Sequence, residues 1–435
     1  MVLTLVFIGL LVSGLPIFVC LGLVTMIFMF AEGIPLQLLV RSLYAGVDQY
    51  TLIAVTGFIL VGYLFESAGI TEALINLVKK LMHSFKAGLA VITIVACAVF
   101  AAVTGSGPAT VATIGGVMIP SMIAAGYDRR FSGAVAVSGG ALGILIPPSN
   151  PFLMYGIIAS QSIGALFLAG ILPGIIMTVA LSVMAGILLN RSSKNDKNGT
   201  IDTEKDKGSK EKLTIKIVIK SFWEAKWALI AIFLLLGGIY AGFFTPIEAA
   251  EVTVFYTLLV GFAFTKKMKL KDLYSALSRT LKLSGTLIIL VAAGTAFSKL
   301  LTIMQVPQNL AMSLSGVSQN ANVILLIIMA LMIFIGTWCE TFSQIIILTP
   351  IFLPIVVALG VDPIHFGVLF VVCAEIGFLT PPFGANLFVG MKIAKISLEE
   401  ISKSTIPFIF VYILVLLLLV FFPAISTWLP NLVFG

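Results

Sequence analysis

Long apolar stretches, separated by a few short polar segments, dominate the hydropathy pattern of this chain. The stretches run for roughly 18–25 residues, which is the length of helix that crosses the hydrocarbon core of a bilayer. They are continuously apolar, whereas the strands of a membrane β-barrel alternate between apolar and polar residues. The pattern therefore predicts an all-α polytopic membrane protein.

The same sequence pattern occurs twice. Residues 119–156 align without a gap on residues 353–390, and twelve positions are identical. The identical pairs include Pro120/Pro354, Gly126/Gly360, Asp128/Asp362, Gly143/Gly377, Pro147/Pro381 and Pro148/Pro382. A Pro-Pro pair removes backbone donors and breaks a helix. Broken backbone at membrane depth is tolerated only where protein or a water-filled cavity satisfies it. Paired broken helices in two halves of a membrane protein therefore indicate a transport site.

The basic residues predict that the two copies have opposite orientations in the membrane. Lysine and arginine are enriched in cytoplasmic loops, and they mark segments 79–86, 129–130 and 266–271. Segments 306–320 and 362–365 contain neither residue. We therefore expect the second copy to be inverted, with both chain termini on the periplasmic side.

The first inverted repeat is expected to span residues 1–190. It contains a re-entrant hairpin at 87–127, whose tip is rich in Gly, Ser and Pro, and a broken helix at 131–158. A strongly polar cytoplasmic linker, residues 191–222, follows it.

The second inverted repeat is expected to span residues 223–435. Its hairpin is predicted at 321–360 and its broken helix at 364–391. An amphipathic piece near 269–281 should precede a separate span at 283–300, and these two segments lie before the hairpin. The last helix is expected near 405–428.

Composition excludes a soluble chain. Of the 435 residues, 60% are hydrophobic and 10% are charged, whereas charged residues make up about a quarter of a soluble domain. The net charge of +7 comes from basic residues in short loops, so it does not indicate nucleic-acid binding. The cysteines have no CxxC spacing and are interpreted as small core residues: Cys20, Cys97, Cys339 and Cys373.

The hairpin tips and the helix breaks supply the groups that bind ions. Unwound carbonyls and the C-terminal ends of half-helices can coordinate a cation, while half-helix N-termini favour an anion. Sodium, a hard cation, would suit such an all-oxygen shell. The alternative is that Gly, Ser and Thr only allow close helix packing in lipid. The pairing of a tip with a Pro-Pro break in both copies favours binding sites.

Polar side chains near these segments are further candidates. Acidic residues in apolar segments are energetically unfavourable and indicate function. Glu340 lies in the second tip and could bind a cation, a proton or a hydroxylated substrate, or be a solvated loop carboxylate. Glu375 is expected to face a packed helix with a partner. Asn150 and Asn386 follow the two breaks and can donate and accept hydrogen bonds.

These residues resemble a known family. The first tip TGSGPATVATIGGVMIPSM, the break GILIPPSN, the second tip GTWCETFSQIIILTPIFLPI and the break GFLTPPFGANLFVG are similar to those of the large membrane subunit of tripartite ATP-independent periplasmic (TRAP) transporters, the DctM family. The resemblance covers essentially the full length.

The resemblance implies an elevator-type secondary transporter in the bacterial inner membrane, with a mobile part built from the hairpins and broken helices. It implies a small four-helix membrane partner and a periplasmic binding protein that delivers an organic anion. Sodium would drive uptake, and the anion would be a C4-dicarboxylate or a sialic acid. Glu340-Thr341, where many members carry Asp, is consistent with a sialic-acid subgroup.

The resemblance also assigns candidate residues. The first sodium site would comprise Thr104, Gly105, Ser106, Gly143, Ile146 and Pro148. The second would comprise Gly336, Thr337, Gly377, Thr380 and Pro382. Candidate substrate-binding residues are Ser149, Asn150, Glu340 and Asn386.

Other protein classes fit the sequence less well. A self-sufficient sodium/anion elevator symporter of the divalent-anion type would carry Ser-Asn-Thr motifs at its tips, and the chain has none. A membrane-embedded enzyme would need an intramembrane His partner, HExxH or GxGD. Both histidines, His83 and His365, are expected in loops, and those motifs are absent. A channel would not need two broken-helix sites, and no Walker A motif is present. We therefore expect a transporter and not an enzyme.

Overall fold

The computed structural model describes residues 6–7, 9–10, 13–82, 88–195, 215–318, 320–382 and 384–435. Residues 83–87 and 196–214, which include part of the predicted basic loop and most of the predicted linker, lie outside the described residues. The described residues form helices joined by turns, without a strand. Among them, six helices are long and apolar enough to cross a membrane, or seven if one bent pair is a single span. The expected all-α polytopic fold is confirmed.

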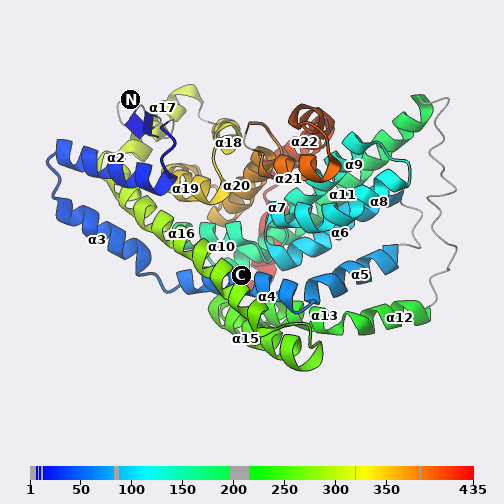
Figure 1. Ribbon diagram of the computed structural model, residues 1–435. Helices are drawn as coiled ribbons and strands as arrows, with labels where there is room; N and C mark the ends of the chain where they lie inside the picture. Colours follow the sequence, from blue (N-terminus) through cyan, green and yellow to red (C-terminus); the bar gives the residue numbers. More distant parts are fainter. Residues whose placement is uncertain are drawn as a thin grey trace.

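One long helix, α16 (Leu270–Ile303), crosses much of the molecule (Figure 1). It packs against α2 (Ile17–Ala31), α3 (Leu36–Val47) and α4 (Leu52–Ser67). The expectation of separate pieces at 269–281 and 283–300 was wrong. Residues 270–303 contain no proline, so nothing removes a hydrogen bond and the helix continues.

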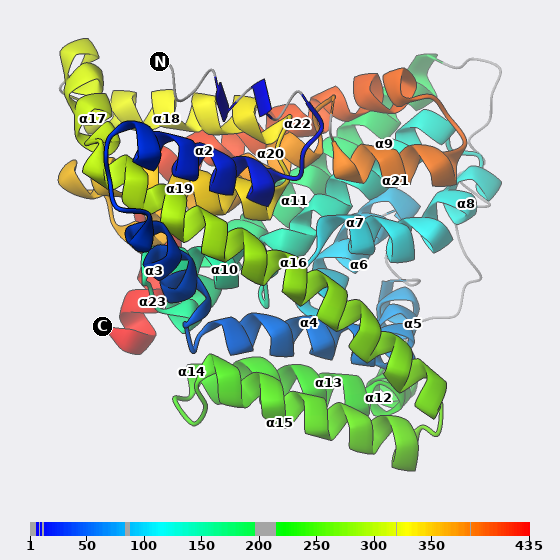
Figure 2. The same ribbon diagram turned by 60° about the vertical axis from the view of Figure 1, so that its left-hand side comes forward.

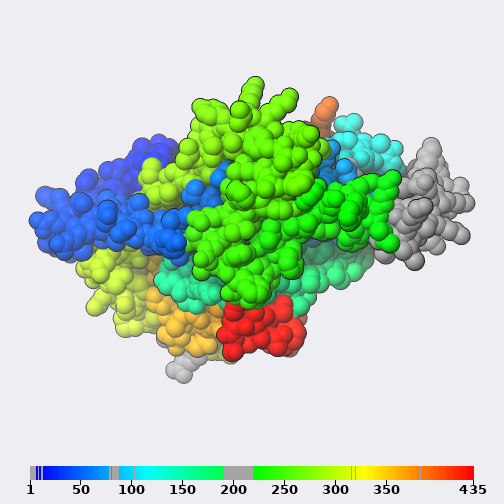
Figure 3. Space-filling model, turned by 90° about the horizontal axis from the view of Figure 1, so that it is seen from below, coloured from blue at the N-terminus to red at the C-terminus, as the bar shows by residue number. Residues whose placement is uncertain are grey.

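A second group of helices packs beside α4 with its own hydrophobic cluster. The group comprises α5 (Ile70–Met82), α12 (Ile215–Glu224), α13 (Lys226–Ile232), α14 (Gly238–Tyr240) and α15 (Pro246–Leu259). Phe65, Leu74 and Val260 lie in its buried cluster. Two ion pairs connect α5 to other parts of this group. Glu72 pairs with Lys267 at 2.6 Å, and Lys80 pairs with Glu224 of α12. Residues of this group cover the middle of the face in Figure 3.

The first hairpin consists of α6 (Gly88–Thr104) and a returning helix. The return comprises α7 (Gly107–Thr110), a π-helical turn at Val111–Gly115 and α8 (Gly116–Ala124). The broken helix follows as α9 (Arg129–Ala141), a 3₁₀ turn at Leu142–Ile144 and α10 (Asn150–Ala159). Helix α11 (Ile163–Asn195) then packs against α6.

The second repeat has the same plan. Helix α17 (Val306–Val317) leads to a hairpin of α18 (Ala321–Gly336) and α19 (Thr341–Ala358). The broken helix comprises α20 (Pro363–Phe378) and α21 (Ala385–Ala394). The expectation that His365 lies in a loop was wrong, because Asp362 caps α20 and the helix begins before His365, which is buried. In the view of Figure 2, α18, α19 and α20 lie near α2, and α21 lies farther to the right, next to α9.

Equivalent residues shape the two copies in the same way. Asp128 caps α9 by accepting from the Arg130 and Phe131 amides, and Asp362 caps α20 from the same position. Gly126 and Gly360, which precede these caps, both have positive φ values, +93° and +79°. The Pro147–Pro148 and Pro381–Pro382 bonds are both cis. The sequence repeat is therefore a structural repeat.

The chain ends in α22 (Leu398–Phe421) and α23 (Ala424–Phe434). The expected single helix at 405–428 was wrong at both ends. Ser397 and Glu400 form a capping box that starts α22 earlier. Pro423 ends it, because the residue before a proline disfavours helical backbone. Glu400 also pairs with Arg130 of the first repeat at 2.8 Å.

Candidate functional site

The first hairpin tip lies directly against the first break. Helix α6 ends at Thr104, Gly105 turns the chain with φ +55°, and Ser106 starts α7 in extended backbone. A Cβ on Gly105 would lie 2.9 Å from the Pro148 carbonyl oxygen and 3.1 Å from the Asn150 amide nitrogen. Only glycine combines this backbone angle with so close an approach.

Oxygen atoms gather where Gly143 meets this tip. A Cβ on Gly143 would lie 2.6 Å from the Ser106 carbonyl oxygen and 2.8 Å from the Thr110 hydroxyl. The Thr110 hydroxyl donates to the Ser106 carbonyl at 2.8 Å and lies 2.9 Å from the Thr104 hydroxyl. Thr110 was not among the predicted site residues, because it lies inside the return helix. Its position four residues after Ser106, one helical turn away, was the available signal.

The second tip makes the equivalent contact. Helix α18 ends at Gly336, and a Cβ on Gly377 would lie 2.6 Å from the Gly336 carbonyl oxygen. Gln344, also missed by the sequence analysis, packs on Gly336 and donates to the Met332 carbonyl at 2.6 Å. Both repeats therefore place a tip carbonyl against the glycine that precedes the break.

The threonine hydroxyls of the second site donate to their own helices. Thr337 donates to the Phe334 carbonyl at 2.8 Å, and Thr380 donates to the Ile376 carbonyl at 2.7 Å. Each hydroxyl oxygen keeps lone pairs that can accept a further interaction. This geometry is compatible with ligating a cation.

The two breaks differ in burial. Pro147, Pro148 and Ser149 are buried, whereas Pro381 and Pro382 are exposed. Ile146 contributes to closing the first break, since it packs over Gly174 on α11. The sequence alignment did not distinguish the breaks, because burial depends on α11, which lies outside the aligned segment.

Two candidate polar residues, Ser149 and Glu340, serve as helix caps. Ser149 accepts from the Phe152 amide at 3.3 Å and donates to the Ile144 carbonyl. The exposed Glu340 accepts from the Phe342 amide at 3.0 Å and from the Ser343 amide at 3.4 Å. A carboxylate at this position also interacts favourably with the dipole of α19.

The partner expected for Glu375 is not found among the described residues. Glu375 is fully buried in α20, and neither carboxylate oxygen has a hydrogen-bond partner in the described part of the chain.

Asn386 lies close to the first repeat. A Cβ on Gly107 would lie 3.0 Å from its Oδ1 atom and 3.1 Å from its Nδ2 atom.

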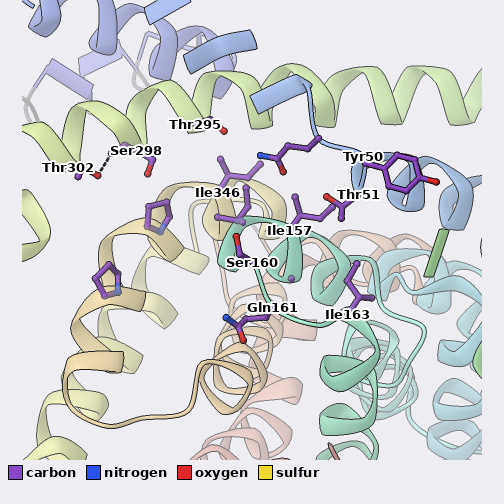
Figure 4. A pocket seen from close by; sticks show the side chains of 16 residues that line it. Tyr50, Thr51, Ile157, Ser160, Gln161, Ile163, Thr295, Ser298, Thr302 and Ile346 are labelled. Atoms are coloured by element: carbon purple, nitrogen blue, oxygen red, sulfur yellow. Dashed lines mark hydrogen bonds between the residues drawn. The ribbon is translucent and has the colours of Figure 1, made fainter. Parts of the chain in front are cut away.

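A cavity of about 640 Å³ lies between α16 and the helices α10 and α19. In Figure 4, Ser298 and Thr302 lie on one side of the cavity, and Ser160 and Ile346 lie on the other. Its polar lining is neutral, with hydroxyl and amide groups, and none of the candidate sodium or substrate residues contributes to it. The cavity therefore lies between parts of α16 and the repeats and is not the candidate site itself.

An all-helical membrane fold with two hairpin tips set against two broken helices defines a class of secondary transporter. The family described as "Tripartite ATP-independent periplasmic transporter, DctM component" matches residues 4–425. The chain belongs to this family.

The chain is similar to several transporter permeases. It is 38% identical over 97% of its length to the isethionate TRAP transporter permease protein DctMQ of Oleidesulfovibrio alaskensis, of which it spans 65%. It is 33% identical over 98% of its length to the C4-dicarboxylate large permease DctM of Rhodobacter capsulatus, covering 97% of that protein. The sialic acid large permease SiaM of Vibrio cholerae is also 33% identical, with coverage of 98% and 97%.

A solved structure shares the fold. The chain superimposes on the YdaH transporter of Alcanivorax borkumensis with a TM-score of 0.64, covering 88% of each chain, at 14% sequence identity.

Proposed function

We propose that this chain is the large membrane subunit of a sodium-coupled tripartite transporter that imports a small organic acid. The observation that carries the proposal is the repeated contact between a tip carbonyl and a break glycine, Ser106 with Gly143 and Gly336 with Gly377. The first contact brings backbone and hydroxyl oxygens together, and the second places the Gly336 carbonyl oxygen, at the end of α18, against α20. Carbonyl oxygens at such helix ends suit a hard monovalent cation.

Each sodium ion would bind at one tip and its break. At the first site, Thr104, Ser106 and Thr110 offer oxygens next to Gly143. At the second, the Gly336 carbonyl and the Thr380 hydroxyl flank Gly377. An ion that joins a tip to a break would hold the hairpin in place, and this would link sodium binding to substrate binding.

The names of the relatives support the proposed substrate class. Their names include isethionate, C4-dicarboxylate and sialic acid transporters. These substrates share an acid group on a small polar body. We therefore propose a carboxylate or sulfonate substrate, with Ser149, Asn150, Glu340 and Asn386 as the candidate contacts.

Movement would take place between the long helix and the repeats. Helices α4, α5 and α13 contribute to a small hydrophobic cluster away from the hairpins, although α4, α15 and α16 also pack into the main cluster that contains the hairpins. The 640 Å³ cavity along α16 leaves this side of the hairpins less tightly packed. We propose an elevator motion in which the hairpins and broken helices slide past α16.

The chain would work with a small membrane subunit and a periplasmic binding protein. Large apolar side chains remain exposed on α15 and α16, among them Phe255, Tyr274 and Leu281. This surface can be covered by lipid and by the small subunit. We propose the bacterial inner membrane as its location.

Replacing Thr380 with valine should raise the sodium concentration that half-saturates uptake by about tenfold, equivalent to about 1.4 kcal/mol. Valine keeps the shape and removes the hydroxyl oxygen, so the bound ion would lose one oxygen ligand. The measurement is uptake by the complete transporter in liposomes at fixed membrane potential. Thr380→Ser, which keeps the hydroxyl, should stay near wild type. An uptake rate that does not depend on the sodium concentration would reject cation coupling.

Cysteine labelling of intact cells should place Gly316 outside and Lys269 inside. Gly316 lies in the segment without basic residues, and Lys269 lies in a basic one. The ion pair of Lys267 with Glu72 connects two segments that are both predicted to be cytoplasmic. On the predicted periplasmic side, the Tyr155 hydroxyl donates to the Pro363 carbonyl at 2.7 Å.

In a background with Cys339 replaced by serine, an impermeant maleimide should modify Gly316→Cys and leave Lys269→Cys unmodified until the cells are opened. The reverse labelling pattern would reject the inverted orientation.

A further inference from the structure

The side chain of Asn386 is buried without a partner. It is 0% exposed, and neither its Oδ1 nor its Nδ2 atom has a hydrogen-bond partner among the described residues. A buried amide in this state is unfavourable, because it has lost water and gained nothing in return. An anionic or polar ligand would satisfy it.

Asn386 lies at an open helix N-terminus. It is the second residue of the ten-residue helix α21, whose N-cap is Gly384 and which has no side-chain cap. The first amides of a helix have no partner within the helix, and they carry the positive end of its dipole. The equivalent end of the first repeat differs, since Ser149 caps α10. The amide NH₂ of Asn386 and the free N–H groups of α21 are all donors suited to an anion.

The first hairpin tip covers this N-terminus. Gly107, the first residue of α7, is the residue whose Cβ would lie 3.0 Å and 3.1 Å from the Asn386 amide atoms. Gly105, two residues earlier, makes the similar approach to Asn150. The tip therefore lies between two asparagines, one from each repeat, and it must shift for a ligand to reach Asn386.

We propose that the N-terminus of α21, with the Asn386 amide, binds the acid group of the transported anion, and that the first hairpin tip closes over it. This inference rests on the proposed function for the class of substrate. A neutral amide and backbone N–H groups bind a carboxylate or sulfonate without a permanent ion pair, so the substrate can be released. Because the covering tip also carries the first candidate sodium residues, sodium binding and closure over the anion would involve the same segment.

The test measures uptake by Asn386→Ala in the complete transporter, with isethionate, succinate and sialic acid as probes. The KM of the transported probe should rise at least tenfold, while the half-saturating sodium concentration should change less than threefold. The Tm should not fall, because truncation removes an unpaired polar group. A structural role would instead lower the Tm. Asn386→Ser, which keeps one donor, should give an intermediate KM.

Asn322→Ala is the matched control. Asn322 is also the second residue of its helix, α18, but its side chain is exposed and Asn320 caps that helix. Its KM should equal that of wild type. An unchanged KM in Asn386→Ala, or a fall in Tm of both Asn386 variants, would overturn the subsite alone. Absence of sodium-driven uptake of all three probes by the wild-type transporter would instead overturn the proposed function and the subsite with it.

Discussion

Gly377→Ala is expected to abolish sodium-driven uptake and to lower the stability of the protein by about 1–3 kcal/mol, as overpacking does in tight cores. The added methyl group would lie 2.6 Å from the Gly336 carbonyl oxygen and 3.0 Å from its Cα atom. Both are backbone atoms and cannot rotate away. The second tip would have to move from the break, and the proposed second sodium site would open.

The matched control for this prediction is Gly285→Ala in the middle of α16. No atom lies within 4 Å of a Cβ at Gly285, so the only expected effect is the better helix propensity of alanine. Thermal unfolding and uptake should be measured on both variants. Normal sodium-driven uptake by Gly377→Ala would show that contact between the tip and the break is not required for transport.

The sequence predicted features that depend on local chemistry. Pro147–Pro148 and Pro381–Pro382 interrupt their helices because proline lacks a backbone donor and clashes with the preceding turn. Asp128 and Asp362 cap the helices that follow them. Local chemistry therefore predicts where the helices are interrupted, and the hairpin bounds and their use in transport stay predictions.

The features that the sequence could not predict depend on distant partners. The first break is buried because α11 covers it at Gly174. Asn386 contacts Gly107 although they belong to different repeats, and no spacing within either repeat indicates that contact. Glu340 seemed a candidate ligand because acidic residues are rare in apolar segments. Its capping of α19 was visible only once the helix start was placed.

The continuity of α16 is another feature that the sequence did not predict. Charged residues near its start, including Lys271 and Arg279, suggested an amphipathic surface helix separate from the span. In the structure the same helix continues to Ile303. The residues of α16 change from polar to apolar along the helix. The sequence pattern alone cannot distinguish such a change within one helix from a boundary between two helices.

Liposomes that contain this chain without a small membrane subunit and a periplasmic binding protein are expected to show less than about a hundredth of the uptake of the complete transporter. That ratio corresponds to a coupling of about 2.7 kcal/mol between components. Apolar side chains on α15 and α16, including Phe255 and Leu281, remain exposed in the chain alone. In the proposed tripartite transporter, the binding protein captures the substrate and delivers it to this chain.

The experiment omits each component in turn and measures uptake driven by an inward sodium gradient, with isethionate, succinate and sialic acid as substrates. Omitting the binding protein should abolish uptake even at substrate concentrations far above its binding constant, because delivery requires docking on the outer face. Omitting the small subunit should abolish it because α15 and α16 would then be held by lipid alone. Full-rate sodium-driven uptake by this chain alone would refute the tripartite assignment. It would favour the self-sufficient elevator symporter, in which tips and breaks of the same geometry capture the anion directly from solution.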